Sequence, residues 1–186
     1  MTRGNAIGVI ELASLHMGFA VLDEILEMTQ VEKILARTIC SGKYLIIVRS
    51  TIADVEECLE VAREKGGFAI VSALMIPNID ERVFPALAGS NTLDRPRVDG
   101  MLILETFSVA TAIKAADFAL KEADINLLRI HAAMAIGGKG LVVMTGNIDA
   151  LKSAVEPAVE FAKEEGMLAG YSLITDPHED ILRELI

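Results

Sequence analysis

The chain is poor in cysteine, histidine and aromatic residues. Its 186 residues include two cysteines, three histidines, two tyrosines, six phenylalanines and no tryptophan. The histidines (His16, His131 and His178) have no second ligand at the spacing that zinc sites use, which argues against a metal site formed within one chain. Two cysteines without a secretion signal are typical of free thiols in a reducing cytoplasm, so we expect the protein to be cytoplasmic.

Basic residues are also scarce. The chain has 17 lysines and arginines against 27 aspartates and glutamates, giving a formal net charge of −10 and a pI of about 4.8. Nucleic acid and anionic membrane bind positively charged surfaces, so neither is an expected partner. The longest uncharged stretch, residues 66–79, contains a proline. It is shorter than the roughly 18 to 20 apolar residues of a membrane-spanning helix.

Hydrophobic residues, in contrast, are abundant. They make up 52% of the chain, and the mean hydropathy is +0.45. A protein of this length can bury one large core or two small ones, and apolar surface that remains outside needs a partner. We therefore expect a folded protein that assembles through large interfaces.

The sequence contains two copies of one pattern. The segment "GVIELASLHMGFAVLDEIL" matches "LILETFSVATAIKAADFAL", which pairs Glu11 with Glu105. "SGKYLIIVRSTIADV" matches "GGKGLVVMTGNIDAL", which pairs Lys43 with Lys139, and "SALMIPNIDERVFPAL" matches "SLITDPHEDILRELI". The three blocks follow one another in the same order in both halves, which indicates a duplicated domain.

The first half alternates between strand and helix patterns. Residues 6–12 are typical of a strand, and the helix pattern that follows has one apolar face with Leu15, Phe19, Leu22 and Ile25. Two strand patterns then flank a turn at 41–42. A second helix follows, capped by Thr51 and with a buried stripe of Ile52, Val55, Leu59 and Ala62. A strand closes the unit before Pro77.

The second half repeats this order, with strands near 101–106, 125–135, 141–145 and 168–174 and helices near 109–123 and from 148. The order β-α-β-β-α-β predicts an α+β fold of two tandem ferredoxin-like domains. We place the first domain at residues 1–90, a linker at 91–99 and the second domain at 100–186, because residues 88–100 are polar and rich in turn formers.

Several of these segments resemble one protein family. They are "AIGVIEL" at the first strand, "ALKEADINLLR" after the first helix of the second half, and the glycine-lysine turns at 42–43 and 138–139. Together with the doubled domain they resemble the tandem-domain shell proteins of bacterial microcompartments, which enclose metabolic enzymes. "TICSGKYLIIV" is especially similar to the tandem shell proteins of propanediol-utilisation compartments. The resemblance implies a non-catalytic homotrimer that imitates a hexagonal tile and packs laterally against other shell proteins.

The resemblance also implies where functional residues lie. It places the turns of both halves around a central pore lined by Ser41, Gly42, Lys43, Ile136, Gly137, Gly138 and Lys139. It places Lys121, in "ALKEADINL", at the tile edge where neighbouring tiles meet. The alternative for Lys121 is a solvated lysine at a helix end. The first half has Glu27 at the corresponding position, so the edges of the two halves differ in charge.

Cys40 stands just before the first of these turns. Its counterpart 94 positions later is Met134, so a trimer carries three such thiols at one level. The resemblance implies a 4Fe-4S cluster held by Cys40 of three chains, because propanediol-type relatives are known for one. Three thiolates can bind three irons of such a cluster and leave the fourth open. The implied role is to move electrons across the shell or to serve encapsulated redox enzymes. The alternative is a pore-lining thiol without a cluster.

Other candidate sites favour structural roles. Cys58 has helical spacing with Val55 and Ala62, which predicts burial in a core. The glycine-lysine turns lack the spacing of a phosphate-binding loop. The matching of Glu11 with Glu105 follows from the duplication alone and does not require a catalytic carboxylate pair.

Three classes of function remain open. The first is a structural shell tile, either with the cluster or with a metal-free metabolite pore. The second is a trimeric ferredoxin-like small-ligand regulator, which should carry a cluster of convergent polar groups. The third is an iron–sulfur carrier outside any shell, which should supply all cluster ligands from one chain. The sequence shows neither such a polar cluster nor enough cysteines, so the shell tile is favoured.

Overall fold

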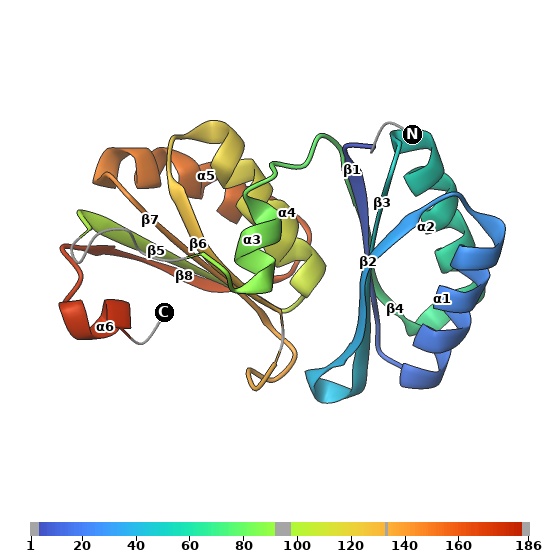
Figure 1. Cartoon of the computed structure of the whole chain (residues 1–186). Helices are drawn as coiled ribbons and strands as arrows, with labels where there is room; N and C mark the ends of the chain where they lie inside the picture. The colour runs from blue at the N-terminus through green and yellow to red at the C-terminus, as the bar shows by residue number, and fades with distance from the viewer. Residues whose placement is uncertain (1–3, 92–97, 133, 184–186) are drawn as a thin grey trace. The chain divides into compact units, whose positions relative to one another are not determined.

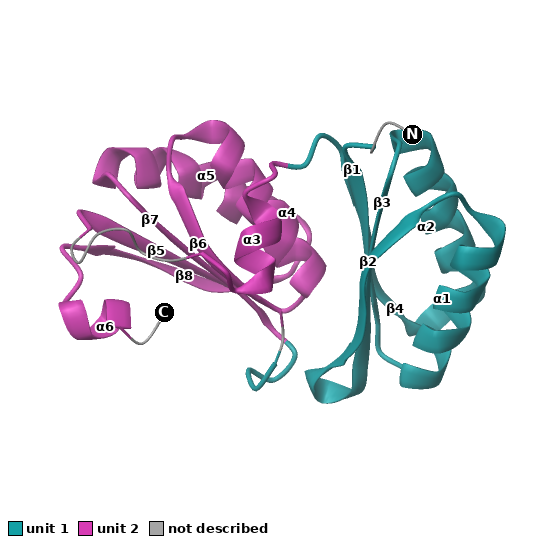
Figure 2. Ribbon diagram, in the orientation of Figure 1, with its two compact units in different colours: residues 1–79, 134–138 teal, residues 80–133, 139–186 magenta. Residues whose placement is uncertain are grey.

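The computed structural model describes residues 4–91, 98–132 and 134–183 of the chain. Two compact units are present, coloured separately in Figure 2. Unit 1 consists of residues 1–79 and 134–138, and unit 2 of residues 80–133 and 139–186. Most of the expected linker at 91–99, residues 92–97, lies outside the described residues.

Unit 1 is a four-stranded antiparallel sheet with two helices on one face (Figure 1). The strand order is β2-β3-β1-β4, and every neighbouring pair is antiparallel. The strands are β1 (Ala6–Leu12), β2 (Glu32–Ile39), β3 (Lys43–Ser50) and β4 (Ile70–Ile76). The helices are α1 (Leu15–Met28) and α2 (Ile52–Gly66), and short 3-10 turns lie at η1 (Cys40–Gly42) and η2 (Gly67–Ala69).

Unit 2 repeats this arrangement with the strand order β6-β7-β5-β8. Its strands are β5 (Gly100–Thr106), β6 (Asn126–Ala132), β7 (Gly140–Gly146) and β8 (Leu168–Thr175), and its main helices are α4 (Val109–Glu122) and α5 (Ile148–Glu164). Two short helices, α3 (Val83–Ala88) and α6 (Glu179–Arg183), were not expected from the sequence. The predicted α+β fold and its duplicated β-α-β-β-α-β order are confirmed.

The pairing register of the first and third strands is the same in the two sheets, whereas the fourth strand is shifted by two positions relative to the sequence match, since Glu11 pairs with Ser72 and Glu105 with Gly170. Glu11 pairs with Leu45 across β1 and β3, and Glu105 pairs with Leu141 across β5 and β7. Equivalent serines also begin equivalent helices, since the hydroxyl oxygens of Ser14 and Ser108 each accept a backbone N–H from the residue three positions later. Such side-chain caps satisfy amide donors that the first helical turn leaves unpaired.

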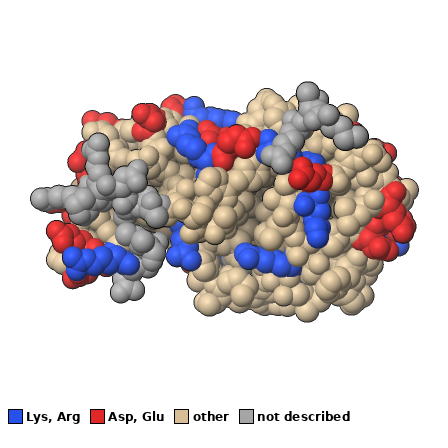
Figure 3. All heavy atoms as spheres, in the orientation of Figure 1, with Lys and Arg blue, Asp and Glu red and all other residues tan. Residues whose placement is uncertain are grey.

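The surface carries charges of both signs. On the face shown in Figure 3, basic and acidic side chains occur in small groups separated by uncharged surface. Among the described residues, no helix has the length and apolar character needed to cross a membrane.

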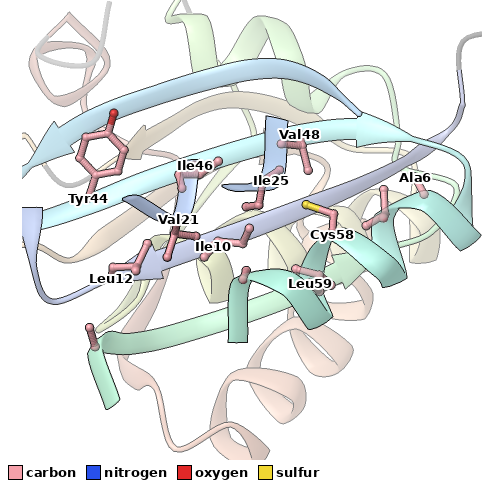
Figure 4. Close-up of a cluster of buried hydrophobic side chains, with 13 residues drawn as sticks. Ala6, Ile10, Leu12, Val21, Ile25, Tyr44, Ile46, Val48, Cys58 and Leu59 are labelled. Atoms are coloured by element: carbon pink, nitrogen blue, oxygen red, sulfur yellow. The ribbon is translucent and has the colours of Figure 1, made fainter. Parts of the chain in front are cut away.

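The core of unit 1 lies between its sheet and its helices. Figure 4 shows Ile10 of β1 and Ile46 of β3 facing Val21 of α1 and Cys58 of α2. Cys58 is fully buried, as the helical spacing predicted. Each large aliphatic side chain buried in this way contributes about 1.5 to 3 kcal/mol relative to exposure.

Helix α1 buries only part of the face that was expected, since Ile25 is fully buried and Leu22 packs against the core. Its buried residues are Gly18, Val21 and Ile25, whereas Leu15 is 40% exposed and Phe19 is 60% exposed. The reason is close packing at Gly18, where an added Cβ would lie 2.4 Å from Cβ of Tyr44. A glycine at this point lets the helix approach β3 and leaves Leu15 and Phe19 on the outer side of the helix. Ile52, expected in the buried stripe of α2, is also 44% exposed.

Candidate functional site

The candidate site begins at the tight turn that joins β2 to β3. Ser41 has φ 64° and ψ 25°, and Gly42 has φ 69°, so both residues are in the left-handed region. This conformation suits glycine but costs other residues roughly 1 kcal/mol or more. Cys40 is half-buried at the start of the turn, and Ser41 and Gly42 are exposed.

A second loop lies against this turn within unit 1. It consists of residues 134–138, between β6 and β7, and its contacts assign it to unit 1. The backbone N–H of Ala135 donates to Sγ of Cys40 at 3.0 Å, and Oγ of Ser41 donates to the carbonyl oxygen of Gly137 at 3.0 Å. At Gly138, whose φ is 81°, an added Cβ would lie 3.2 Å from the carbonyl oxygen of Cys40. Glycine therefore permits the close approach of the two segments.

An ion pair beneath the turn fixes the next residue, Lys43. Its Nζ lies 2.7 Å from Oε1 of Glu11, whose side chain is completely buried. The same ammonium donates to the carbonyl oxygen of Gly138 at 3.4 Å. Lys43 thus links the sheet to the 134–138 loop, and its charge is compensated below the turn.

The equivalent pair in unit 2 is far more exposed. Nζ of Lys139 lies 3.2 Å from Oε1 of Glu105, and the two side chains are 36% and 39% exposed. The ammonium also lies 5.8 Å from the ring centroid of Phe107, within the range of a cation–π contact. The duplication has therefore produced the same pair in two different environments.

Lys121 lies apart from these turns, in the last turn of α4. Its Nζ is 2.5 Å from Oδ2 of Asp117, four residues earlier, and its side chain is 41% exposed. Asp117 is only 2% exposed and also accepts the backbone N–H of Asp80 at 2.9 Å. Lys121 therefore compensates a buried carboxylate and still reaches the surface.

Of the two thiols, only Cys40 lies where a ligand could reach it. Burial raises the pKa of Cys58 to about 12, against a weaker lowering by the Thr29 hydroxyl. Within the described parts of the chain, no group of three or more histidine, cysteine or acidic side chains is placed to hold a metal ion. A cluster at Cys40 would therefore need sulfur from other copies of the chain.

Unit 1 thus brings Cys40, the expected cluster ligand, together with most of the residues expected to line a pore: Ser41, Gly42, Lys43, Ile136, Gly137 and Gly138. Sequence reasoning missed two supporting groups, the backbone N–H of Ala135 and the buried carboxylate of Glu11. The second had a visible signal, because the duplication matches both Glu11 with Glu105 and Lys43 with Lys139. The first is a main-chain group and leaves no mark in the side-chain pattern.

The structure contains two fused copies of a four-stranded α+β domain, and each copy has a glycine-lysine turn before its third strand. These features define a tandem-domain α+β protein. The family model for the BMC domain matches residues 6–79 and 102–177. The chain therefore belongs to the BMC-domain family, as a tandem-domain shell protein of bacterial microcompartments.

Two curated proteins illustrate this relationship. The bacterial microcompartment shell protein PduT of Citrobacter freundii is 36% identical over 181 residues, which cover 97% of each chain. The carboxysome assembly protein CcmO of Synechocystis sp. is 28% identical over 194 aligned positions. That alignment covers 95% of the present chain and 63% of CcmO. That PduT is a shell protein fits the expected non-enzymatic role.

Solved structures give the same fold. A crystal structure of a microcompartment protein from Desulfitobacterium hafniense DCB superposes with a TM-score of 0.83 at 31% identity, covering 96% of this chain and 98% of that one. The fused permuted hexameric shell protein MSM0275 of the RMM microcompartment superposes with a TM-score of 0.63 at 19% identity, covering 86% and 81% of the two chains. The second likeness concerns the fold alone.

Proposed function

We propose that this shell protein forms a homotrimer in which six domains make one pseudohexagonal tile. Shell proteins of this family assemble into oligomeric tiles. Because each chain contributes two copies of the domain, three chains supply the six domains of a hexagon. A head-to-tail contact between identical chains closes naturally into such a ring. The tile would then associate laterally with other shell proteins, with Lys121 at its edge.

In this tile the turns at 40–43 and 136–139 surround a central pore. The pore-lining set is Ser41, Gly42, Lys43, Ile136, Gly137, Gly138 and Lys139. The exposed members of this set are Ser41, Gly42 and Gly137, and such small residues allow several backbones to approach closely. Lys43 is neutralised by Glu11, so its charge is set back from the turn.

Cys40 would supply the sulfur ligands of a 4Fe-4S cluster, one from each of three chains. The observation that carries this proposal is the position of its sulfur, which lies at an exposed turn and accepts the N–H of Ala135. The donor set fits such a group, because thiolate is the usual ligand of iron–sulfur clusters and hydrogen bonds to sulfur are one means of setting their potentials. When bound, the cluster would supply one-electron redox chemistry for transfer across the shell.

The protein's own residues would hold this ligand in place. The Ser41–Gly137 hydrogen bond keeps the 134–138 loop on the turn, and the loop presents the Ala135 N–H to the sulfur. Lys43 adds a second tie to the loop at Gly138. The partners implied by this role are redox enzymes enclosed by the shell.

Anaerobic reconstitution with iron and sulfide tests the cluster. We expect about four irons per trimer and a visible charge-transfer band in the wild type. Cys40→Ala should lose both while its sedimentation remains that of the wild type, and Cys58→Ala serves as the matched control that keeps them. Equal iron binding by Cys40→Ala would refute the cluster.

The metal-free metabolite pore is the second candidate, favoured by the single accessible thiol per chain. It predicts that purified wild-type protein forms ordered sheets in electron microscopy without binding iron stoichiometrically. A protein that forms neither tiles nor sheets and binds a small metabolite would instead be the regulator.

A further inference from the structure

Equivalent positions in the two repeats differ in exposure at the end of the first helix. In unit 2, Asp117 is 2% exposed and Leu120 is 4% exposed. Their counterparts 94 positions earlier in α1 are Asp23, which is exposed, and Leu26, which is 45% exposed. The same part of the fold is therefore covered in one repeat and open in the other.

The cover in unit 2 comes from the segment that follows β4. The backbone N–H of Asp80 donates to Oδ1 of Asp117 at 2.9 Å. The guanidinium of Arg82 donates to the carbonyl oxygens of Leu120 and Ile125, both at 3.1 Å. Helix α3 then packs against the edge strand β6 and buries Val83 and Ala86. This segment caps the end of α4 and seals the sheet edge.

Unit 1 presents the equivalent surface without this cover. We call it the α1–β2 edge and define it by Asp23, Leu26 and Met28 of α1 and residues 32–34 at the start of edge strand β2. All of these residues are exposed, with Met28 at 60%. The segment that follows the first repeat, residues 80–91, packs in unit 2 and therefore does not cover the α1–β2 edge of unit 1.

One copy of the covering segment remains in the sequence, after β8. "PHEDILR" at 177–183 matches "PNIDERV" at 77–83, which pairs Asp180 with Asp80. After each strand, a backbone N–H returns to the residue before the first strand of its unit: Ile79 N–H donates to Asn5 O, and Asp176 N–H donates to Asp99 O. A left-handed residue lies beside or at each donor (Asn78, φ 50°; Asp176, φ 47°), although the two donors are not matched positions in the sequence. In the single chain the second segment rests on its own sheet, where Leu182 contacts the cluster of Met101, Leu128 and Val143.

We propose that the segment after β8 in one copy covers the α1–β2 edge of a second copy. The N–H of Asp180 would donate to Asp23 of that copy, as Asp80 donates to Asp117 within unit 2. The segment that follows the first repeat, residues 80–91, covers the second repeat of the same chain. By the same rule, the segment that follows the second repeat, residues 177–183, would cover the first repeat of another chain. The contact is head-to-tail and rests on the proposed homotrimer, whose ring it would close. It requires Leu182 to leave its own sheet on assembly.

Disulfide trapping between two differently tagged chains tests this contact. Both chains carry Cys40→Ala, and one also carries Asp23→Cys and the other Asp180→Cys. A disulfide forms only where the two Cα atoms approach within about 7 Å. We expect a cross-linked heterodimer in large excess over the control that carries Asp149→Cys, an exposed α5 position, in place of Asp180→Cys. Equal yields from the two pairs would overturn the proposal.

A single chain with both cysteines distinguishes the second copy from self-coverage. A disulfide confined to the monomer would show that the segment covers its own chain and would overturn the proposal. A covalent ladder of dimers and trimers supports it.

A charge substitution tests the same surface without cysteines. Leu26→Glu should weaken self-association by roughly ten- to a hundredfold, because a leucine side chain is no longer buried on assembly. The matched control is Phe68→Glu, since Phe68 is fully exposed beside α2 and outside the α1–β2 edge. If both variants sediment as the wild-type oligomer, this contact is wrong and the trimeric tile stands. If the wild type itself is a monomer at micromolar concentration, both proposals fall.

Discussion

The buried ion pair between Glu11 and Lys43 offers the sharpest test of how the turns are held. Glu11→Gln removes the negative charge while keeping the shape of the side chain. Lys43, whose side chain is 16% exposed, is then left as a nearly buried cation. Glu105→Gln makes the same change at the equivalent pair, where both side chains are more than one-third exposed. The duplication thus provides its own control.

The two substitutions should differ clearly in cost. Breaking a buried ion pair by removing one partner typically costs roughly 3 to 5 kcal/mol. Because Lys43 keeps its bond to the Gly138 carbonyl and a weaker one to the new amide, we expect about 2 to 4 kcal/mol for Glu11→Gln. The exposed pair should be worth no more than about 1 kcal/mol, since solvent screens it. For a chain of this size about 3 kcal/mol corresponds to roughly 6 to 12 °C in melting temperature.

Urea unfolding followed by circular dichroism measures the difference. The expected result is a lower midpoint for Glu11→Gln at an unchanged slope, with Glu105→Gln near the wild type. The double variant Glu11→Gln/Lys43→Met should recover much of the loss, because replacing both partners leaves no unpaired charge. Equal effects of the two glutamate substitutions would show that burial does not set the strength of these pairs.

Three further outcomes follow from named contacts. Cys58, whose pKa burial raises to about 12, should resist alkylation at pH 8 until denaturant is added, so mass spectrometry should count one labelled thiol in the native chain and two in the unfolded one. Lys121→Ala should leave the oligomer intact and weaken sheet formation in electron microscopy, and unchanged sheets would remove the edge assignment. Lys121→Asp should also destabilise the fold, because it places a second carboxylate beside buried Asp117. Hydrogen bonds from Arg82 lower the pKa of Asp80, so this carboxylate stabilises the fold above its unfolded value of about 3.9 and loses that contribution as pH falls through its lower folded value. Asp80→Asn should therefore flatten the dependence of stability on pH in acid titrations, and an unaltered slope would contradict the assignment.

The sequence predicted the long elements well because their periodicity is strong. It missed α3 and α6, which have six and five residues and are too short to show a helical pattern. It also placed Leu15 and Phe19 of α1 in the core beside Leu22 and Ile25, because they look like core residues while Gly18 carries no side chain. Packing of the Gly18 backbone against Tyr44 decides the face, and that contact joins distant parts of the chain.

The candidate site was predictable in its residues but not in its contacts. Duplication places the turn at 40–43 and the loop at 134–138 in equivalent positions, which the sequence shows directly. That the loop lies on the turn depends on hydrogen bonds across 95 residues, one of them from a main-chain N–H to Cys40. Such bonds arise from the arrangement of whole elements and have no local signature.

The compact units and the repeats divide the chain at different places. Residues 80–91 come from the first repeat but belong to unit 2, and residues 134–138 come from the second repeat but belong to unit 1. A split gene that encodes the two repeats separately would therefore produce two fragments, each carrying a piece of the other's unit and lacking a piece of its own. Fragment complementation on co-expression, rather than independent folding of either half, is the behaviour that this exchange of segments dictates.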